Sequence, residues 1–532
     1  MNHLRLGQCL GTVPPATFRR RHNESLINSL AHQKEITFFY SRPSSTGRND
    51  GNNCPPPTTT TASASASGTI AHQAGVNCLA IDGNEGRYLF SGGADSTVRL
   101  WDLEEHTASR TAPAGVPREY HPSAALTRST PSSHTHALTS ISIYPFDPTP
   151  STLLTTSYDK SLKVTSITPT SLVPVHTFDL DFLPYTHCVS SVPDSSPLIA
   201  VGTAHPAVRL LDLRSGLSTH SLSGPNGAVY TLAWSPRTSY ILASGSADGR
   251  VLFYDIRRAN AVFASLDSDD AVGVVGEQPS TGLGARTELL DFHTAAHNGP
   301  VTSVQWTPSG DRLVTAGHDQ RIRVWDTATG RNELVHFGPR IRNERQGELK
   351  PLISPPGTHA PGRESLFWPN DDGRGVVFQH HLREGHLLGI LRTEGVKVAE
   401  VQAAKKHGRT GAAGVSTAVA RLTSAGRINA MVWRTDAPLG DGLEMYTAHG
   451  DGRICAWMPR PKDAPEEKDD DDDNVDDDES GTAGDTSAGG DGRRQLPPGS
   501  GDADDAADRK KRKRDLMADL VGGLARRPMR FS

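Results

Sequence analysis

The sequence predicts an all-β fold, a seven-bladed β-propeller with an N-terminal helix, a disordered linker and a disordered C-terminal tail. Three stretches share one pattern: SGGADSTVRLWD at 91–102, ASGSADGRVLFYD at 243–255 and VTAGHDQRIRVWD at 314–326. Each combines small residues and an Asp with alternating apolar positions that end in an aromatic residue and a second Asp. One such unit cannot bury its apolar face alone, so several must stack side by side. A spacing of about 40–45 residues and the Trp-Asp ending are typical of WD40 blades, which form a ring-shaped binding platform.

The composition indicates that only part of the chain is folded. Of 532 residues, 35% are hydrophobic and 22% are charged, which is a low apolar share for a fully globular chain. The net charge of −5 is unevenly distributed, because residues 463–479 hold twelve acidic residues and one lysine. We therefore expect the folded part of the chain to be slightly basic rather than acidic.

Cysteine spacing and the lack of long apolar runs exclude several classes of protein. The five cysteines are far apart and form no CxxC pair, so we expect a reducing compartment, with neither a disulfide framework nor a zinc site. Residues 1–11 lack the apolar core of a signal peptide. No stretch approaches the roughly 18 apolar residues of a membrane helix, so we expect a soluble protein without a membrane partner.

Residues 1–35 are predicted to form an N-terminal helical docking segment. One amphipathic helix is predicted over residues 14–32, because Pro14 and Pro15 suit a first turn, where a missing N–H costs nothing. An apolar stripe flanked by arginines follows at helical spacing, and its members are Phe18, Arg19, Arg20, Leu26, Ile27 and Leu30. Residues 36–69 are predicted to hold a short strand at 36–40, a candidate for the outer strand that closes the ring. The linker at 41–69 is rich in Pro, Thr and Ser and is expected to be disordered.

The propeller itself is predicted over residues 70–460, with insertions at 106–134 and 264–292. The sixth blade diverges most from the repeat. The expected blades span residues 70–105, 135–168, 175–216, 217–259, 293–330, 331–390 and 391–459.

A buried hydrogen-bond chain is expected inside the most regular blades, with an imidazole between a turn Asp and an indole N–H. A fragment of a catalytic triad is the alternative, but the trio recurs at the repeat period and no nucleophile recurs beside it. A structural role is therefore favoured, since buried polar groups need partners. The residues expected in this role are His72, Asp95 and Trp101, then His297, Asp319 and Trp325, with Asp248 and Trp457 at equivalent positions.

No motif indicates an enzyme. The sequence contains no HExxH, GxSxG or GxxxxGK[ST] pattern, each of which would place ligands or a nucleophile at a fixed spacing. His380 takes the position of a blade aromatic, so the nearby His381 is expected to point to the other face of its strand, away from a shared metal. We expect no catalytic residue, no metal and no cofactor.

Two arginines are predicted to form a docking site on one rim of the ring. Arg257 lies two residues after Asp255, where the third strand of the fourth blade ends, and Arg214 stands in the same relation to Asp212 in the third blade. Adjacent blades would thus present both guanidinium groups on one side, where they can bind carboxylates or carbonyls of a partner. The alternative is that an arginine after a strand is an ordinary surface-turn residue.

Residues 461–532 are predicted to be a disordered acidic and basic tail. The acidic run at 463–479 is interpreted as a solvated segment, with binding to a basic partner as the alternative. A basic cluster follows, and a nuclear import signal is favoured over non-specific contact with nucleic acid. Its residues are Arg509, Lys510, Lys511, Arg512, Lys513 and Arg514.

Several stretches resemble the Cockayne syndrome group A protein family, with the character of a fungal-type relative. They are the arginine-bearing N-terminal helix, NEGRYLFSGGADSTVRLWDLE, YPFDPTPSTLLTTSYDKSLKV, AWSPRTSYILASGSADGRVLFYDIRRA and GRICAWMP. The resemblance covers roughly residues 14–460 and follows the blades in order. The insertions and the tail are longer than the family pattern needs.

The resemblance implies a function. Members of that family are WD-repeat substrate receptors of a cullin-RING ubiquitin ligase and act in transcription-coupled nucleotide excision repair. They dock on the large subunit of damaged-DNA-binding protein, the ligase adaptor, through an N-terminal helix and an Asp-x-Arg box. The box carries over to Asp255 and Arg257, with Tyr254 in place of the usual Trp, and to Asp212 and Arg214 as a second copy.

The implied partners and location follow from the same resemblance. They are a Cockayne syndrome group B-type repair factor and stalled RNA polymerase II, in the nucleus, for a chain that is not itself an enzyme. We expect no sequence-specific binding to DNA, because the folded part shows no dense basic stripe with interleaved aromatics. The alternative function is a chromatin- or histone-binding scaffold outside any ligase, with residues 463–479 as the contact.

Overall fold

The computed structural model describes residues 2–40, 70–105, 117–147, 149–193, 197–258, 262–268, 295–344, 347–360, 362–393, 426–435 and 443–460. All of them belong to one compact unit, Met1–Ala464. The predicted linker at 41–69 and the tail at 461–532, with its acidic run and basic cluster, lie outside the described residues.

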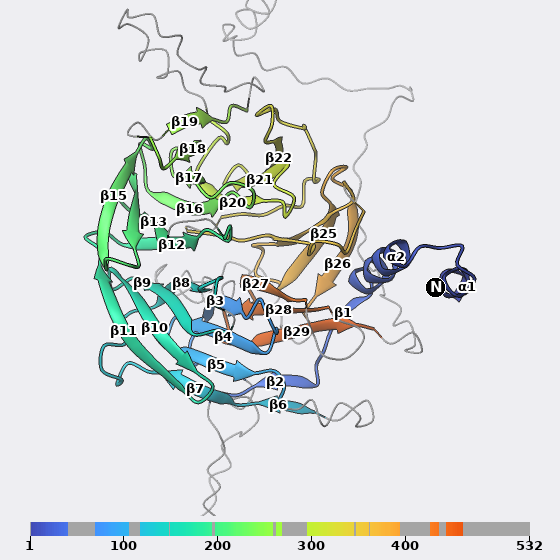
Figure 1. Ribbon diagram of the computed structural model, residues 1–532, viewed down its shortest axis with the longest axis horizontal. Helices are drawn as coiled ribbons and strands as arrows, with labels where there is room; N and C mark the ends of the chain where they lie inside the picture. Colours follow the sequence, from blue (N-terminus) through green and yellow to red (C-terminus); the bar gives the residue numbers. More distant parts are fainter. Residues whose placement is uncertain are drawn as a thin grey trace, which may run out of the picture. The chain divides into compact units, whose positions relative to one another are not determined.

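Seven antiparallel sheets stand around a central axis, so the predicted seven-bladed β-propeller is confirmed (Figure 1). The first four blades, from the inner to the outer strand, are β3 (Val76–Ile81), β4 (Tyr88–Gly93), β5 (Val98–Asp102) and β7 (Pro122–Leu126); β8 (Leu138–Ile143), β9 (Thr152–Ser157), β10 (Ser161–Thr168) and β11 (Ser171–Asp179); β12 (Pro184–Val189), β13 (Leu198–Thr203), β14 (Ala207–Asp212) and β15 (Leu217–Ser223); β16 (Val229–Trp234), β17 (Ile241–Ser246), β18 (Val251–Asp255) and β19 (Val262–Ser265).

The last three blades are less regular. They are β20 (Val301–Trp306), β21 (Arg312–Gly317) and β22 (Ile322–Asp326); β23 (Leu352–Ile353), β24 (Ser365–Pro369), β25 (Val376–His381) and β26 (Leu387–Arg392); β27 (Ile428–Arg434), β28 (Glu444–His449), β29 (Ile454–Pro459) and β1 (Leu30–His32). In the described part of the chain the fifth blade has three strands, and its edge makes one isolated bridge, Trp325 to Asn332.

Each blade is apolar on both faces, because each face packs on a different neighbour. Neighbouring residues of a strand point to opposite faces. Leu89 of β4 and Trp101 of β5 pack in a cluster with the seventh blade, whereas Phe90 and Leu100 pack in a cluster with the second blade. This two-sided burial explains the nearly continuous apolar runs of the strands, and it requires a closed ring.

The N-terminal segment closes that ring. β1 pairs with β29, with Leu30 opposite Pro459 and His32 opposite Trp457. The expectation that residues 36–40 supply the closing strand is therefore wrong. The reason is that Leu30 is buried in the apolar core between the sixth and seventh blades, whereas Ile36 and Phe38 are buried in a different cluster, between the first and seventh blades.

The strand predicted at 36–40 exists but has another role. β2 (Ile36–Phe38) pairs in parallel with β6 (Arg118–Tyr120), and Phe38 stacks on Tyr120 at 5.1 Å between ring centroids. β6 and β7 both lie inside residues 106–134, which we expected to be a polar insertion. That expectation is corrected, because β7 is the outer strand of the first blade.

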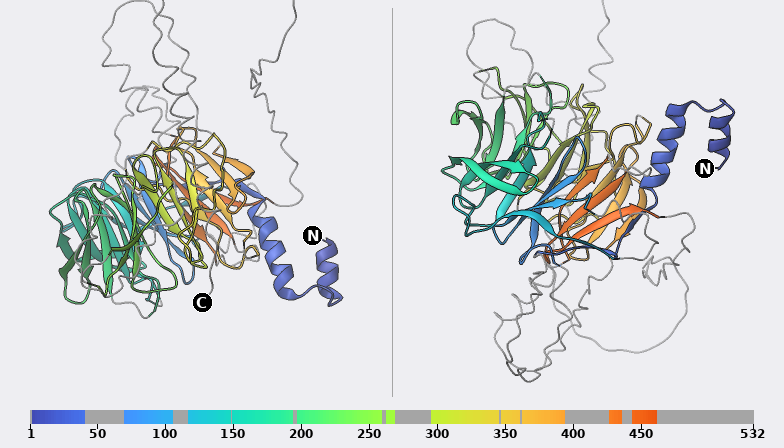
Figure 2. Two further views of the ribbon diagram at one scale, coloured as in Figure 1. Left: turned by 90° about the horizontal axis from the view of Figure 1, so that it is seen from above. Right: turned by 60° about the horizontal axis from the view of Figure 1, so that its bottom comes forward.

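Two helices precede the ring, where one was predicted. α1 (Asn2–Cys9) and α2 (Pro15–Ile27) form a helical hairpin, and Figure 2 shows it standing outside the blades. α2 ends five residues earlier than the expected segment 14–32, since Leu30 is drawn into β1. Among the described residues no helix is long and apolar enough to span a membrane.

The closing strand makes a first prediction. The backbone N–H of Arg460 donates to Ser29 O at 2.8 Å and that of Gln33 donates to Ala456 O at 2.9 Å, so Ala31, opposite Met458, takes the hydrogen-bonded position between them. We expect Ala31→Pro, which removes this donor, to lower the free energy of unfolding by about 1–3 kcal/mol. Urea unfolding of this variant and of Ala31→Ser, which keeps the N–H, checks it. Equal midpoints for the proline variant and the parent would contradict closure by β1.

Candidate partner-binding face

The ring has two faces, which we call face A and face B. On face A lie the turns between the second and third strands of each blade, including those of Asp95, Asp159, Asp248 and Asp319. On face B the third strands end, for example at Asp255. The two faces carry different sets of predicted residues.

On face A the first blade contains the predicted buried residues His72, Asp95 and Trp101. Ser91, which was not predicted, joins His72 to Trp101. His72 Nδ1 lies 3.1 Å from Asp95 Oδ1, and its Nε2 lies 2.7 Å from Ser91 Oγ, which also accepts a hydrogen bond from Trp101 Nε1 at 2.9 Å. A neutral imidazole with its proton on Nδ1 satisfies this chain, since Ser91 can then donate to Nε2. Burial lowers the pKa of His72 in agreement.

The fifth blade repeats this arrangement, and the seventh blade keeps the Trp, Thr and His part of it. His297 lies 2.9 Å from Asp319 and 2.8 Å from Thr315 Oγ1, to which Trp325 Nε1 donates at 2.8 Å. In the seventh blade Trp457 Nε1 donates to Thr447 Oγ1 at 3.0 Å, and the histidine is His449, from the strand end rather than the loop.

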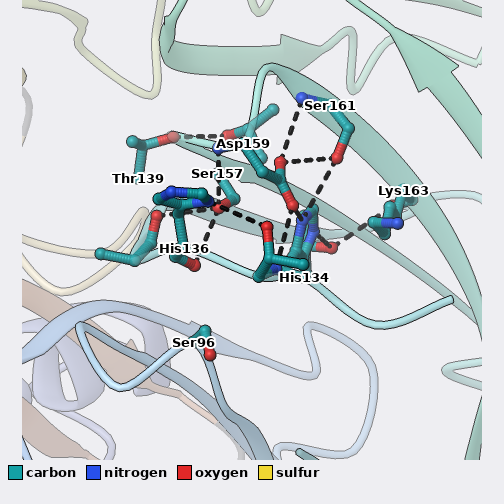
Figure 3. A network of polar contacts seen from close by, with 12 residues as sticks. Ser96, His134, His136, Thr139, Ser157, Asp159, Ser161 and Lys163 are labelled. Carbon is teal, nitrogen blue, oxygen red and sulfur yellow. Dashed lines mark hydrogen bonds and ion pairs between the residues drawn. The ribbon is translucent and has the colours of Figure 1, made fainter. Parts of the chain in front are cut away.

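Two further blades keep part of this series of hydrogen bonds. In the second blade His134 lies 2.8 Å from Asp159 (Figure 3). His134 also lies 2.9 Å from Thr155. His134 was missed because it lay in the presumed insertion. In the fourth blade Asp248 accepts hydrogen bonds from the backbone N–H groups of Asn226, at 2.9 Å, and Arg250, at 3.1 Å.

The Ser and Thr residues that complete these networks were missed, but the sequence contains a signal for them. A Ser or Thr stands four residues before the turn Asp in these five blades, at Ser91, Thr155, Ser244, Thr315 and Thr447. Burial alone would raise the pKa of the Asp319 carboxyl, but the hydrogen bond from His297 and the charge of Arg323 hold it well below its usual value. These networks are therefore buried structural parts of the blades.

On face B, Arg257 has a defined position at the end of β18. Its Nε and Nη2 donate to Asp255 Oδ1 at 2.9 Å and Oδ2 at 2.8 Å, and its guanidinium lies 3.3 Å from the ring centroid of Tyr240. The hydrogen bond from Arg257 lowers the pKa of Asp255. The Arg257 side chain remains 57% exposed while that of Asp255 is 6% exposed, so a buried carboxylate and an aromatic ring hold an accessible guanidinium.

Arg214 occupies the equivalent place in the third blade with less support. Its backbone N–H donates to Asp212 Oδ1 at 2.9 Å, which forms the same turn, and its side chain is exposed. The hydrogen bond from that backbone N–H lowers the pKa of Asp212. The structure thus brings both predicted Asp-x-Arg turns to face B but orders Arg257 more firmly than Arg214.

The predicted helical residues divide into two groups. Arg19 and Arg20 are exposed on α2, and Phe18 and Leu26 are half-buried. Ile27 and Leu30 are buried, at 0% and 6% exposure, in a cluster with Phe367, Met431 and Trp457. We correct the expectation that these two side chains meet a partner, because they attach the helix to the sixth and seventh blades instead.

The strand register places this helix on face B. Leu30 lies opposite Pro459, which is the last residue of β29, and α2 ends at Ile27, three residues earlier. The helical hairpin therefore meets the ring where the third strands end, as do the turns after Asp212 and Asp255. Helix and arginines share one face.

A segment of the chain that contains Glu348 crosses the central channel. Glu348 Oε2 accepts a hydrogen bond from Thr186 Oγ1 at 2.6 Å, and Oε1 accepts one from Thr231 Oγ1 at 3.1 Å. Lys350 lies 3.1 Å from the same carboxylate. This segment leads into β23 of the sixth blade, so Glu348 links that blade to the third and fourth blades across the axis. The cavity left in the channel measures about 130 Å³.

Comparison with known proteins agrees with this architecture. A family model described as "WD domain, G-beta repeat" matches residues 60–102, 127–166, 216–255 and 289–326. The chain is 30% identical over 316 residues to "WD repeat-containing protein ATCSA-1" of Arabidopsis thaliana, which covers 50% of this chain and 69% of the relative. The chain belongs to the WD-repeat family, whose propellers generally act as scaffolds.

Other relatives carry a different description. The chain is 31% identical over 286 residues to "Ribosome biogenesis protein ytm1" of Aspergillus clavatus, and 27% identical over 269 residues to the protein of that name from Pyricularia oryzae. Each match covers 48% of this chain, and the chain spans only 55% and 54% of those two relatives. These matches support the repeat family without specifying the partner.

No cluster of three or more His, Cys, Asp or Glu side chains suited to a metal ion occurs among the described residues. His381 and His386 lie 5.8 Å apart between ring centroids, and His386 pairs with Glu384 at 2.8 Å. His380 is buried against Phe337.

A buried histidine makes stability depend on pH. Burial lowers the pKa of His187 to about 3, and its ring contacts Ser142 and Thr156 of the second blade. In the unfolded chain a histidine titrates near pH 6.5. Between these values the unfolded chain binds a proton that the folded chain does not, so stability is full above pH 6.5 and falls as the pH falls.

We expect each such histidine to remove about 1.4 kcal/mol of unfolding free energy per pH unit between about pH 6 and pH 4. His187→Asn should reduce the slope of unfolding free energy against pH by the amount that one bound proton contributes. This holds whatever the effect of the substitution on stability at pH 7.5. Urea unfolding from pH 7.5 to 4.5 measures both slopes. An unchanged slope in the variant would show that His187 does not titrate in this way.

Proposed function

We propose that this protein is the substrate-recognition subunit of a cullin-RING ubiquitin ligase that acts in transcription-coupled nucleotide excision repair. One observation carries the proposal: the helical hairpin and the two Asp-x-Arg turns lie on the same face of the ring. A single large partner can thus contact all three. Two findings support the same assignment. These elements resemble the Cockayne syndrome group A family, and the chain is similar to the WD repeat-containing protein ATCSA-1.

Face B would hold the ligase adaptor, the large subunit of damaged-DNA-binding protein. The exposed Arg19 and Arg20 on α2 and the guanidinium of Arg257 supply donors for carboxylates and carbonyls. Asp255 accepts hydrogen bonds from two of the five N–H donors of Arg257, and Tyr240 orients the guanidinium, whose exposed donors would bind the partner. Such preorganisation reduces the entropy lost on binding.

Face A would then be available to the repair partners, a Cockayne syndrome group B-type factor and stalled RNA polymerase II. This protein would contribute position rather than chemistry. It raises the effective concentration of target lysines near the catalytic machinery of the ligase. A nuclear location is part of the proposal and depends on the basic cluster at 509–514, which lies outside the described residues.

The test is co-purification of the ligase adaptor with matched variants. We expect Arg214→Ala with Arg257→Ala to weaken adaptor binding at least about tenfold, because arginines at interface centres are common hot spots. A deletion of residues 2–13 tests α1 separately. Any N-terminal deletion must end before Ile27, because removal of Ile27 or β1 opens the ring.

The matched control is Arg374→Ala, an exposed arginine in the turn between β24 and β25 on face A. It should bind the adaptor as the parent does. Parent-like binding by the double arginine variant and by the deletion, with unchanged circular dichroism, would exclude face B as the adaptor site.

A second candidate function is a scaffold in ribosome biogenesis, which the identity to the ytm1 proteins favours. The two functions separate in one experiment on nuclear extract. A ligase receptor is expected to co-purify with the cullin-RING subunits, and more polymerase should accompany it after ultraviolet damage. A ribosome-biogenesis scaffold should sediment with ribosomal precursor particles regardless of damage.

A further inference from the structure

An apolar pocket lies at the outer part of the junction between the fourth and fifth blades. Its volume is about 250 Å³. A cavity of about 150 Å³ accommodates a benzene ring, so the space is sufficient for one aromatic or large aliphatic side chain. Its main apolar walls are Ile241, Phe253, Phe263, Trp306, Leu313 and Trp325.

The walls are rigid and offer almost no free polar groups. Trp306 Nε1 donates to Ala233 O at 3.1 Å and Trp325 Nε1 to Thr315 Oγ1 at 2.8 Å, so both indole N–H groups are already bonded within the ring of blades. Phe253 packs edge-on against Trp306 at 5.9 Å between ring centroids. All of these residues come from strands, which hold a preformed shape, yet Phe263 and Trp306 remain partly exposed.

One wall of the pocket leads toward Asp255 on face B. In the pairing of β17 with β18, Ile241 lies opposite Asp255 and Ala243 opposite Phe253. Phe253 and Asp255 therefore point to the same face of β18. The wall formed by Ile241 and Phe253 thus continues directly into the carboxylate that holds Arg257.

Next to the wall residue Ile241, two guanidinium groups share one carboxylate. Arg257 and Arg258, 57% and 66% exposed, share the single carboxylate of Asp255. The other carboxylate at the pocket, Asp326, is satisfied within its own turn by the backbone N–H of Ala328, at 3.1 Å, and the Thr329 hydroxyl, at 2.8 Å. The guanidinium groups of Arg257 and Arg258 beside this wall therefore keep N–H donors for acidic groups of a partner.

We propose that this pocket docks a partner segment in which one apolar anchor residue lies beside an acidic residue. The anchor would occupy the space between Phe263 and Trp306, and the carboxylate would bind Arg257 and Arg258. The apolar walls of the pocket fit an apolar side chain, and the guanidinium groups of Arg257 and Arg258 beside them fit a carboxylate. A basic segment or a wholly polar segment would match neither feature. The proposal goes beyond the ligase assignment, because it holds for whichever protein supplies the segment.

The test uses the purified full-length chain and three labelled pentapeptides, DEFDE, DEADE and NQFNQ, followed by fluorescence polarisation. We expect DEFDE to bind at least about tenfold more tightly than DEADE, which lacks the anchor, and than NQFNQ, which lacks the charge. Equal affinities for DEFDE and either control peptide, or no binding of DEFDE up to about 1 mM, would overturn the proposal.

A pocket-filling variant locates the site. Ala328 lines the pocket and is exposed, so Ala328→Trp should block it without disturbing the core and remove the preference for DEFDE over DEADE. The control is Thr170→Trp, another exposed position, in the turn after β10 on the same face, which should keep that preference. If Ala328→Trp also keeps it, with circular dichroism like the parent, the pocket is not the site.

The acidic run of the chain itself is the competing occupant. If deletion of residues 463–479 tightens DEFDE binding about tenfold, the pocket is filled by this protein's own acidic residues and the proposal of a partner segment is wrong. Unchanged affinity supports a partner. The peptide assay contains no ligase subunit, so its outcome does not depend on whether the adaptor co-purifies with this protein. Likewise, a failure of peptide binding would not exclude binding of the adaptor.

Discussion

The short pairing between β1 and β29 joins the beginning of the folded chain to its end, and the rest of the structure depends on it. Every blade is apolar on both faces, so an open ring would expose one apolar face of the first blade and one of the seventh. Residues Leu30–His32 complete the seventh sheet by pairing with its third strand, and one face of that sheet packs against the first blade. Ile27 and Leu30 add apolar contacts to the sixth and seventh blades at the same place. Closure and helix attachment are thus one interaction.

That coupling has a consequence for recognition. Because α2 ends three residues before β1, the helical hairpin is fixed to the edge of the ring rather than carried on a free linker. Its position relative to Arg214 and Arg257 is then determined by the closed ring itself. A partner that binds both elements contacts a preorganised surface, which lowers the entropic cost of association. The adjoining pocket lies between strands of two neighbouring blades and depends on the same closure.

The buried polar networks also fix the arrangement of the blades. In the first and fifth blades a histidine joins the loop that enters the blade to a Ser or Thr of the second strand and an Asp of the next turn. Glu348 makes a similar connection across the channel. Buried polar groups are costly when unpaired, so these networks specify one arrangement of loops and blades. Burial also lowers the pKa of His449 to about 3 and that of His187 to about 3, which keeps the rings neutral at physiological pH.

The repeat pattern by itself determined the fold class, the number of blades and the turns that carry Asp255 and Arg257, because alternation of apolar residues and Trp-Asp endings are local properties of strands. It also identified His72, His297 and their Asp partners. Only the tertiary structure decided which strand closes the ring, that β7 lies within a presumed insertion, and that Ile27 and Leu30 are buried rather than exposed. The pocket between Phe253, Phe263 and Trp306 was equally beyond the sequence. Each of these depends on contacts between residues far apart in the chain, and no local spacing records which distant surface a side chain will meet.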